Sequence, residues 1–90
     1  MGKLAGALAL ALTLTVGAFA QSCDRDSIKS VSDDGATIVM ESGAVFRVDS
    51  SDRADTVSWA VADDVLICKD GGELVNVDED GERASVVRKR

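Results

Sequence analysis

The sequence predicts an all-β protein, a small antiparallel barrel of five or six strands of the SH3-like or OB-like type. Three observations predict it. Beyond residue 20, apolar residues alternate with polar ones in short runs, as in strands with one buried face. Glycines and aspartates that favour turns separate these runs at intervals of roughly 8 to 12 residues. The chain has 90 residues, so 90 minus 20 leaves 70, a length that suits a small barrel.

The N-terminal segment has the pattern of a cleavable secretory signal peptide, which we assign to residues 1–20. A lysine near the start and an apolar run over residues 4–16 precede Ala18 and Ala20, which place small side chains at the two cleavage subsites. Cleavage after Ala20 would leave a single domain, residues 21–90. The expected location of that domain is the periplasm or the outside of the cell.

Two other interpretations of this segment were weighed. A membrane anchor is disfavoured because the apolar run is shorter than the roughly 20 residues that cross a bilayer. No stable membrane insertion is therefore expected after cleavage. A lipoprotein would carry its lipid on Cys23, but the preceding Ala20-Gln21-Ser22 lacks the leucine that lipid attachment favours.

The first half of the domain predicts three strands. Residues 36–49 are predicted to form a hairpin with its turn at Ser42-Gly43, because both arms alternate apolar and polar side chains. An earlier strand is predicted at residues 27–32, and Asp33-Asp34-Gly35 supplies the turn between them. In the first arm Ile38 and Met40 are expected on one face, and in the second arm Ala44, Phe46 and Val48 are expected to point inward.

The second half begins with the polar residues 49–55, which predict an exposed loop or a single helical turn. Val57, Trp59 and Val61 then alternate and predict a strand. Trp59 is expected to be the main aromatic residue of the core, in preference to a binding residue at the barrel mouth. Further strands are predicted at residues 65–68, 74–77 and 84–88, with turns at residues 70–72 and 78–82. Residues 65–68 are apolar on both faces, which predicts a strand covered on both sides.

The two cysteines predict a disulfide bond between Cys23 and Cys68. Exported chains meet an oxidising environment, and two cysteines allow only one pairing. Redox or zinc chemistry is disfavoured because the chain has no Cys-x-x-Cys spacing and no histidine. The bond would close a loop of 46 residues, counted from 23 to 68 inclusive. Such a loop is worth about 4 kcal/mol in the chain-entropy model.

Composition argues against several classes of function. Without Lys3, the chain has nine basic and 16 acidic residues, so the net charge of the domain is −7. This charge disfavours nucleic acid, and the basic run Arg88-Lys89-Arg90 is expected to be a solvated, frayed end. The chain has no histidine and no tyrosine, which removes the commonest general base and a phenol. We therefore expect no catalytic residue and no cofactor, although the composition alone is compatible with a two-carboxylate hydrolase.

One acidic motif resembles the start of a calcium loop. Asn76-x-Asp78-x-Asp80-Gly81 places oxygen ligands on alternate residues, with glycine at the bend. The twelfth position is Val87, where such loops need a bidentate glutamate. An acidic hairpin turn without a bound metal is the favoured interpretation. A weak site formed by Asp78, Asp80 and Glu82 at millimolar calcium stays open.

The residues also carry a resemblance to a group of proteins. The segments that carry it are Ile28-x-x-Val31, Asp34-Gly35, Ile38-x-Met40-x-Ser42-Gly43-x-x-Phe46-x-Val48, Trp59, Asp64-Val65 and Leu74-Val75-Asn76. This series spans about residues 27–87 and resembles small exported bacterial β-domains. Phe46 stands where those domains have tryptophan, and Ser42 where they have aspartate. The resemblance implies the barrel fold and bacterial export, and it implies no activity.

These observations favour a non-catalytic binding or interaction module, periplasmic or secreted, whose partner is another protein of the cell envelope. The alternative is a secreted inhibitor that inserts the acidic loop Asp49–Asp55 into the basic active site of an enzyme.

Overall fold

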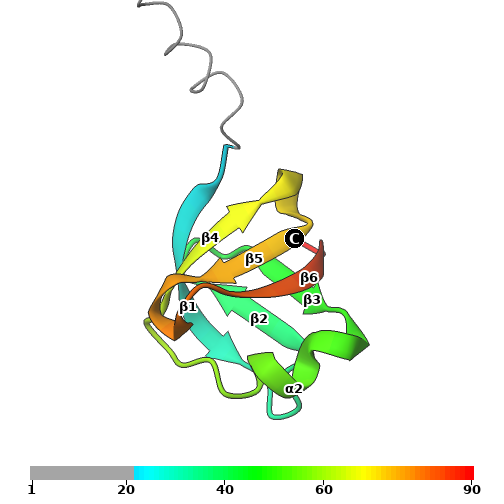
Figure 1. Cartoon of the computed structure of the whole chain (residues 1–90). Coiled ribbons are helices and arrows are strands. Elements are labelled where there is room, and N and C mark those ends of the chain that lie inside the picture. Colours follow the sequence, from blue (N-terminus) through cyan, green and yellow to red (C-terminus); the bar gives the residue numbers. More distant parts are fainter. Residues whose placement is uncertain (1–21) are drawn as a thin grey trace, which may run out of the picture.

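The computed structural model describes residues 22–90, which form a closed antiparallel β-barrel (Figure 1). The predicted all-β fold is therefore confirmed, with six strands and one short α-helix. The predicted signal peptide, residues 1–20, lies outside the described residues. The strands are β1 (Asp24–Val31), β2 (Thr37–Met40), β3 (Val45–Val48), β4 (Asp64–Cys68), β5 (Glu73–Asn76) and β6 (Glu82–Arg88). The helices are the 3-10 turns η2 (Ser50–Asp52), η3 (Lys69–Gly71) and η4 (Val77–Glu79) and the single turn α2 (Arg53–Thr56).

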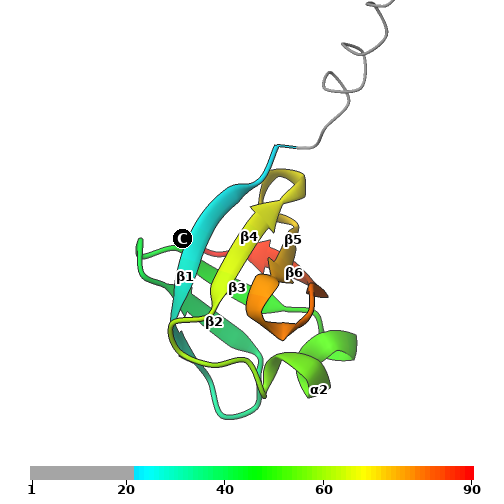
Figure 2. The same ribbon diagram turned by 60° about the vertical axis from the view of Figure 1, so that its left-hand side comes forward.

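The barrel consists of two three-stranded meanders, β1-β2-β3 and β4-β5-β6 (Figure 2). Two antiparallel pairings join them, because β1 pairs with β4 and β3 pairs with β6. Each strand therefore has a hydrogen-bonded neighbour on both sides, and closure removes the open edges through which sheets aggregate. The connection from β3 to β4 carries η2 and α2 and is the longest one between strands.

The core lies inside the barrel, where alternate residues of the strands meet. In β2 and β3 the buried positions are every second residue, because successive side chains of a strand point to opposite faces. The predicted hairpin and its inward residues are thus confirmed. Trp59 is only 4% exposed and joins this core, as the sequence predicts. The buried cluster consists of Ile28, Ile38, Met40, Ala44, Phe46, Val48, Trp59, Val65, Ile67, Leu74, Ala84 and Val86.

The strand predicted around Trp59 is wrong. Val57 is the C-cap of α2, and Ala62 adopts a left-handed backbone with φ 77°, so residues 57–63 form turns. Only Trp59 of the three alternating residues is buried, whereas Val57 is 47% and Val61 is 64% exposed. The segment is held to β1 at one residue: Ala62 N–H donates to Ile28 O and Ile28 N–H donates to Asp63 O. A strand would need pairing along its whole length.

Several predicted boundaries also differ from the structure. β1 begins at Asp24 instead of Ser27, because its polar first residues pair with β4 from Asp24↔Ile67 onward. β6 begins at Glu82 and not at Ala84, since Glu82 is the register partner of Asn76. Val77, predicted at the end of a strand, opens η4 and is 42% exposed.

Two further expectations about strand surroundings are corrected. Leu66 of β4 is only half-buried, because a barrel strand buries one face and leaves the other outside. The basic C-terminal run is not frayed: Lys89 N–H donates to Val45 O, and Val45 N–H donates to Arg90 O. The guanidinium of Arg88 lies over the Phe46 ring, 5.7 Å from its centroid. This end of the barrel is thus covered by the last residues of the chain.

Candidate functional site

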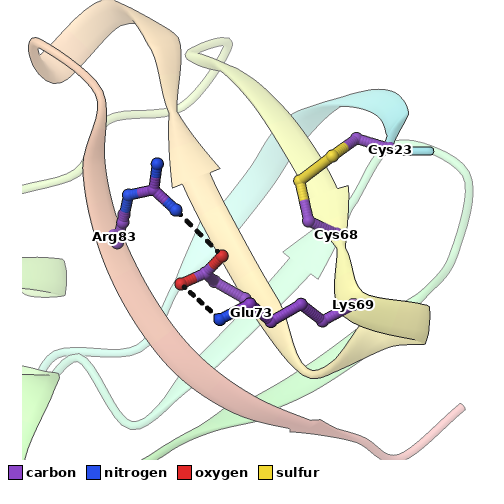
Figure 3. The surroundings of a disulfide bond; sticks show 5 residues. All are labelled: Cys23, Cys68, Lys69, Glu73 and Arg83. Atoms are coloured by element: carbon purple, nitrogen blue, oxygen red, sulfur yellow. Dashed lines mark hydrogen bonds and ion pairs between the residues drawn. A yellow bond between two sulfur atoms is a disulfide. The ribbon is translucent and has the colours of Figure 1, made fainter. Parts of the chain in front are cut away.

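The predicted disulfide is present and joins Cys23 to Cys68 (Figure 3). It ties the residue before β1 to the last residue of β4, and Cys68 is only 3% exposed. Poor access to its sulfur suits a structural bond better than thiol exchange. The bond also engages the Cys23 sulfur to which a lipid would be attached, so lipidation and this disulfide are mutually exclusive.

A small ion cluster lies beside the disulfide. Glu73, the register partner of Cys68, accepts from Arg83 at 3.1 Å and pairs with Lys69 at 3.7 Å (Figure 3). The carboxylate side chain is 12% exposed, whereas both cations are more than half exposed. Because both cations are exposed, each pair contributes little to stability, and the cluster forms a local contact between η3, β5 and β6.

Acidic side chains are concentrated at one end of the barrel, which we call the acidic end and define as residues 32–36, 49–63 and 77–81. The antiparallel strand directions place these three connections at the same end (Figure 2). They contain nine acidic residues and one basic residue, Arg53. The connections and flanking residues at the opposite end, residues 22–23, 41–44, 69–72 and 89–90, contain two acidic and three basic residues. The carboxylates of the acidic end are Asp33, Asp34, Asp49, Asp52, Asp55, Asp63, Asp78, Glu79 and Asp80.

Hydrogen bonds between side chains and backbone hold two of these connections together. The buried side chain of Asn76 donates to Asp63 at 2.9 Å and accepts from Asp78 N–H at 3.0 Å. Asp78 in turn accepts from Asp64 N–H at 2.8 Å. Asn76 is fully buried, and among the described residues no buried side-chain polar atom lacks a hydrogen-bond partner. The residues before β4 and the turn before β6 therefore form one connected surface.

The predicted loop at residues 49–55 is helical, which confirms one of the two expected forms. Thr56, fully buried, donates from Oγ1 to Gly35 O at 2.7 Å. Asp52 accepts from Ser85 N–H at 2.8 Å, and Arg53 Nε donates to Val48 O at 3.0 Å. These bonds fix η2 and α2 against β3, β6 and the β1–β2 turn. The segment presents its carboxylates from a rigid turn.

Two carboxyl groups of the acidic end have shifted titration. The pKa of Asp34 lies below its ordinary value, chiefly because Ala36 N–H and the Ser32 hydroxyl donate to the carboxylate. The pKa of Asp49 is lowered mainly by hydrogen bonding to Ser51. Both groups are fully exposed, so these bonds order the turns locally.

The residues of the calcium-like motif are used within the fold. Asn76 caps η4, Asp78 accepts from Asp64 N–H, and Glu82 accepts from Trp59 Nε1 at 2.6 Å. Asp80 adopts a left-handed backbone with φ 57°. Within residues 22–90, no group of three histidine, cysteine, aspartate or glutamate residues is arranged to hold a metal ion. The carboxylates of Asp78 and Glu82, two of the three predicted for a weak calcium site, thus accept hydrogen bonds from residues 59–64.

Exposed aliphatic side chains share the acidic end. Val57, Val61 and Val77 are 47%, 64% and 42% exposed, and all three lie in its connections. Sequence reasoning missed the first two as surface residues because their alternation with Trp59 also fits a strand. The fourth large hydrophobic residue exposed in the described part of the chain is Val87, on β6. Three of these four exposed residues therefore lie at the barrel end that carries nine of the 16 acidic residues.

A hollow of about 380 Å³ lies where η2 leaves the barrel, lined in part by Arg47, Arg53 and Val87. Asp49 also lines it, so two guanidinium groups and one carboxylate surround this hollow. Among residues 22–90, no helix is both long and apolar enough to cross a membrane.

The chain was also compared with known proteins. No family model, no curated protein and no solved structure matches it. The resemblance to small exported bacterial β-domains stays a prediction.

Proposed function

We propose that this protein is an exported, non-catalytic binding module that acts through its acidic end on another protein of the cell envelope, in the periplasm or outside the cell. The predicted signal peptide supports export. The Cys23–Cys68 disulfide is compatible with an oxidising compartment. The negative net charge of the domain argues against nucleic acid as the partner.

The observation that carries this proposal is the combination of exposed valines and carboxylates on one rigid barrel end. Binding by a preformed surface costs less conformational entropy than binding by a flexible one. The hydrogen bonds of Asn76, Thr56 and Asp52 supply that rigidity. Clustered charge of one sign steers a partner of opposite charge and selects against others.

Catalysis receives less support from the residues present. The sequence lacks histidine and tyrosine, which most often act as general bases or acids alongside carboxylates. Several carboxylates that could replace them, those of Asp52, Asp63 and Asp78, accept backbone or amide N–H groups of the fold. Hydrogen bonds of this kind favour a structural role for these carboxylates over a role in proton transfer.

The alternative, a secreted inhibitor of an enzyme, would use the same end. The observation that favours an inhibitor is the fixed shape of residues 49–55, since inhibitors that need no rearrangement bind tightly. In this segment the carboxylates of Asp49 and Asp52 bond internally, whereas that of Asp55 makes no hydrogen bond within the described residues. Asp55 would therefore be the contact residue of the inhibitor.

Carbodiimide cross-linking tests the proposal, because it couples a carboxylate to a lysine that touches it. Mature protein is cross-linked in envelope extracts of its host, and the coupled residues are mapped by mass spectrometry. We expect adducts at Asp55, Glu79 and Asp80, and none at Glu41 or Asp70 of the opposite end. An enzyme as partner supports the inhibitor, and a structural envelope protein supports the module. Absence of a specific adduct, or adducts confined to the opposite end, contradicts the proposal.

A further inference from the structure

We propose that the acidic end docks a cationic and aliphatic segment of its partner, with Val57, Val61 and Val77 as the apolar contacts and the surrounding carboxylates as the charged rim. This inference rests on the proposed function and adds the chemistry of the partner and the residues that recognise it. The occupant is a stretch of lysine or arginine side chains interspersed with aliphatic ones.

The apolar part of the surface follows from where exposed valines occur. Three of the four large hydrophobic residues exposed in residues 22–90 lie in connections of one barrel end. Val57 and Val61 flank the buried Trp59, and Val77 begins η4. Trp59 Nε1–H bonds Glu82 at 2.6 Å, and Asp63 bonds Asn76, next to Val77. The two valine-bearing segments are therefore bonded to each other.

The charged part decides which partner fits. The three connections carry nine carboxylates and one guanidinium, a local charge of 1 minus 9, or −8. Asp55 lies close to Val57 in the sequence, Glu79 and Asp80 lie close to Val77, and all three acidic residues are exposed. Their carboxylates make no hydrogen bond or ion pair within the described residues. An anionic or purely apolar partner would leave these charges opposed or desolvated at a cost. Lysine and arginine satisfy both features, since their aliphatic stems cover apolar surface while their charged heads stay hydrated.

The basic C-terminal run of this same chain is a competing occupant. Arg88, Lys89 and Arg90 end at the opposite end of the barrel, where Arg90 O accepts from Val45 N–H. A second copy docked through this run would make a head-to-tail contact, which closes into a ring or builds an open filament and does not form a two-fold symmetric dimer. We therefore place a different protein on the acidic end. Self-association becomes an outcome that the test must separate.

Three synthetic peptides probe this surface: alternating lysine and leucine, alternating lysine and serine, and alternating glutamate and leucine. Trp59, the only tryptophan of the chain, lies between Val57 and Val61 and reports binding through its fluorescence. We expect saturable binding of the lysine–leucine peptide that weakens with salt. The lysine–serine peptide should bind on the order of tenfold more weakly, and the glutamate–leucine peptide should not bind.

Two pairs of variants provide matched controls. Val61→Ser and Val87→Ser remove valines of 64% and 62% exposure, but only Val61 belongs to the acidic end. Asp80→Asn and Asp70→Asn neutralise aspartates with φ 57° and 54° at opposite ends. We expect Val61→Ser to weaken lysine–leucine binding on the order of tenfold. Asp80→Asn should weaken it roughly two- to fivefold, and the two control variants should bind as the wild type does.

Equal binding of the lysine–leucine and lysine–serine peptides, or an effect of Val87→Ser as large as that of Val61→Ser, overturns this inference. The cross-linking above would still support a binding module that uses other contacts. Self-association would also overturn this inference. It would appear as a sedimentation mass that rises with protein concentration and falls when Lys89 and Arg90 are deleted, and it would make a second copy of this chain the occupant. A partner cross-linked only through the opposite end would overturn the proposed function as well.

Discussion

The indole nitrogen of Trp59 donates a hydrogen bond to a carboxylate oxygen of Glu82 at 2.6 Å. The ring itself is packed in the core and is only 4% exposed. This one contact joins the irregular segment before β4 to the first residue of β6. The bond thus anchors a tryptophan that lies outside any strand to the start of β6.

Removing this acceptor should destabilise the barrel. Glu82→Ala leaves the buried indole N–H without a partner, which we expect to lower the free energy of unfolding by about 1–3 kcal/mol. Glu82→Gln keeps an acceptor oxygen and should cost less. Urea unfolding followed by Trp59 fluorescence measures both variants. Equal costs for the two would show that the hydrogen bond does not stabilise the fold.

Gly35 is the glycine least able to accept a side chain. Its φ is +74°, and an added Cβ would lie 2.6 Å from Arg53 O and 2.8 Å from Val57 N, both backbone atoms that cannot move cheaply. Gly81 has nearly the same φ of +76°, but an added Cβ there would meet nothing within 4 Å. We expect Gly81→Ala to cost about 1–2 kcal/mol from backbone strain alone, and Gly35→Ala to cost several kcal/mol more. Equal thermal midpoints of the two variants would contradict the close approach of α2 to this turn.

Acid should destabilise the protein in part through Asp34 and Asp49. Both pKa values are lowered in the folded state from an ordinary 3.8, so the deprotonated carboxylates favour folding. This contribution is complete above pH 3.8 and is lost as pH falls through the lowered folded values. The double variant Asp34→Asn, Asp49→Asn should therefore lose less stability than the wild type when the pH is lowered below 3.8. If the free energy of unfolding of the two proteins fell in parallel with pH, Asp34 and Asp49 would not be a source of the acid sensitivity.

Calcium at several millimolar should leave the thermal midpoint unchanged. A specific site that binds only the folded protein would raise the midpoint by mass action. Asp78 and Glu82 already accept hydrogen bonds from Asp64 N–H and Trp59 Nε1, and a metal would have to displace them. A saturable rise that magnesium does not reproduce and that Asp80→Ala abolishes would establish the site.

Local patterns sufficed for the hairpin formed by the second and third strands. The hairpin of β2 and β3 and its buried residues could be predicted because alternation and the Ser42-Gly43 turn act within a few residues. The disulfide could be predicted because two cysteines permit one pairing. Trp59 could be assigned to the core because Phe46 is the only other aromatic residue in residues 21–90, although the strand predicted around it was wrong.

Long-range pairing escaped prediction for a physical reason. The polar start of β1 becomes a strand only because β4, some 40 residues later in the chain, offers it a partner. Val61 is exposed because Ala62 and Asp63 bond to Ile28 of β1, which no local pattern encodes. The acidic end is likewise invisible in the sequence, since its carboxylates come from three separate connections that strand direction brings together.

The disulfide should hold the barrel together. Replacing both Cys23 and Cys68 by serine is expected to lower the free energy of unfolding by roughly 2–5 kcal/mol, the range for removing a native disulfide from a small domain. The acidic end should keep its binding in the fraction that still folds, because the bond lies between β1 and β4 at the opposite end. Loss of peptide binding without loss of stability would assign the cysteines a functional role instead.

One mass measurement tests whether this is an exported, disulfide-bonded barrel. The protein is recovered from the periplasm or medium of a secreting host and is denatured without reductant before its mass is measured. We predict a single species with the mass of residues 21–90 less two hydrogens, which takes up no thiol reagent until it is reduced. A species that retains Met1 to Ala20, or one with two thiols that react before reduction, would contradict the account.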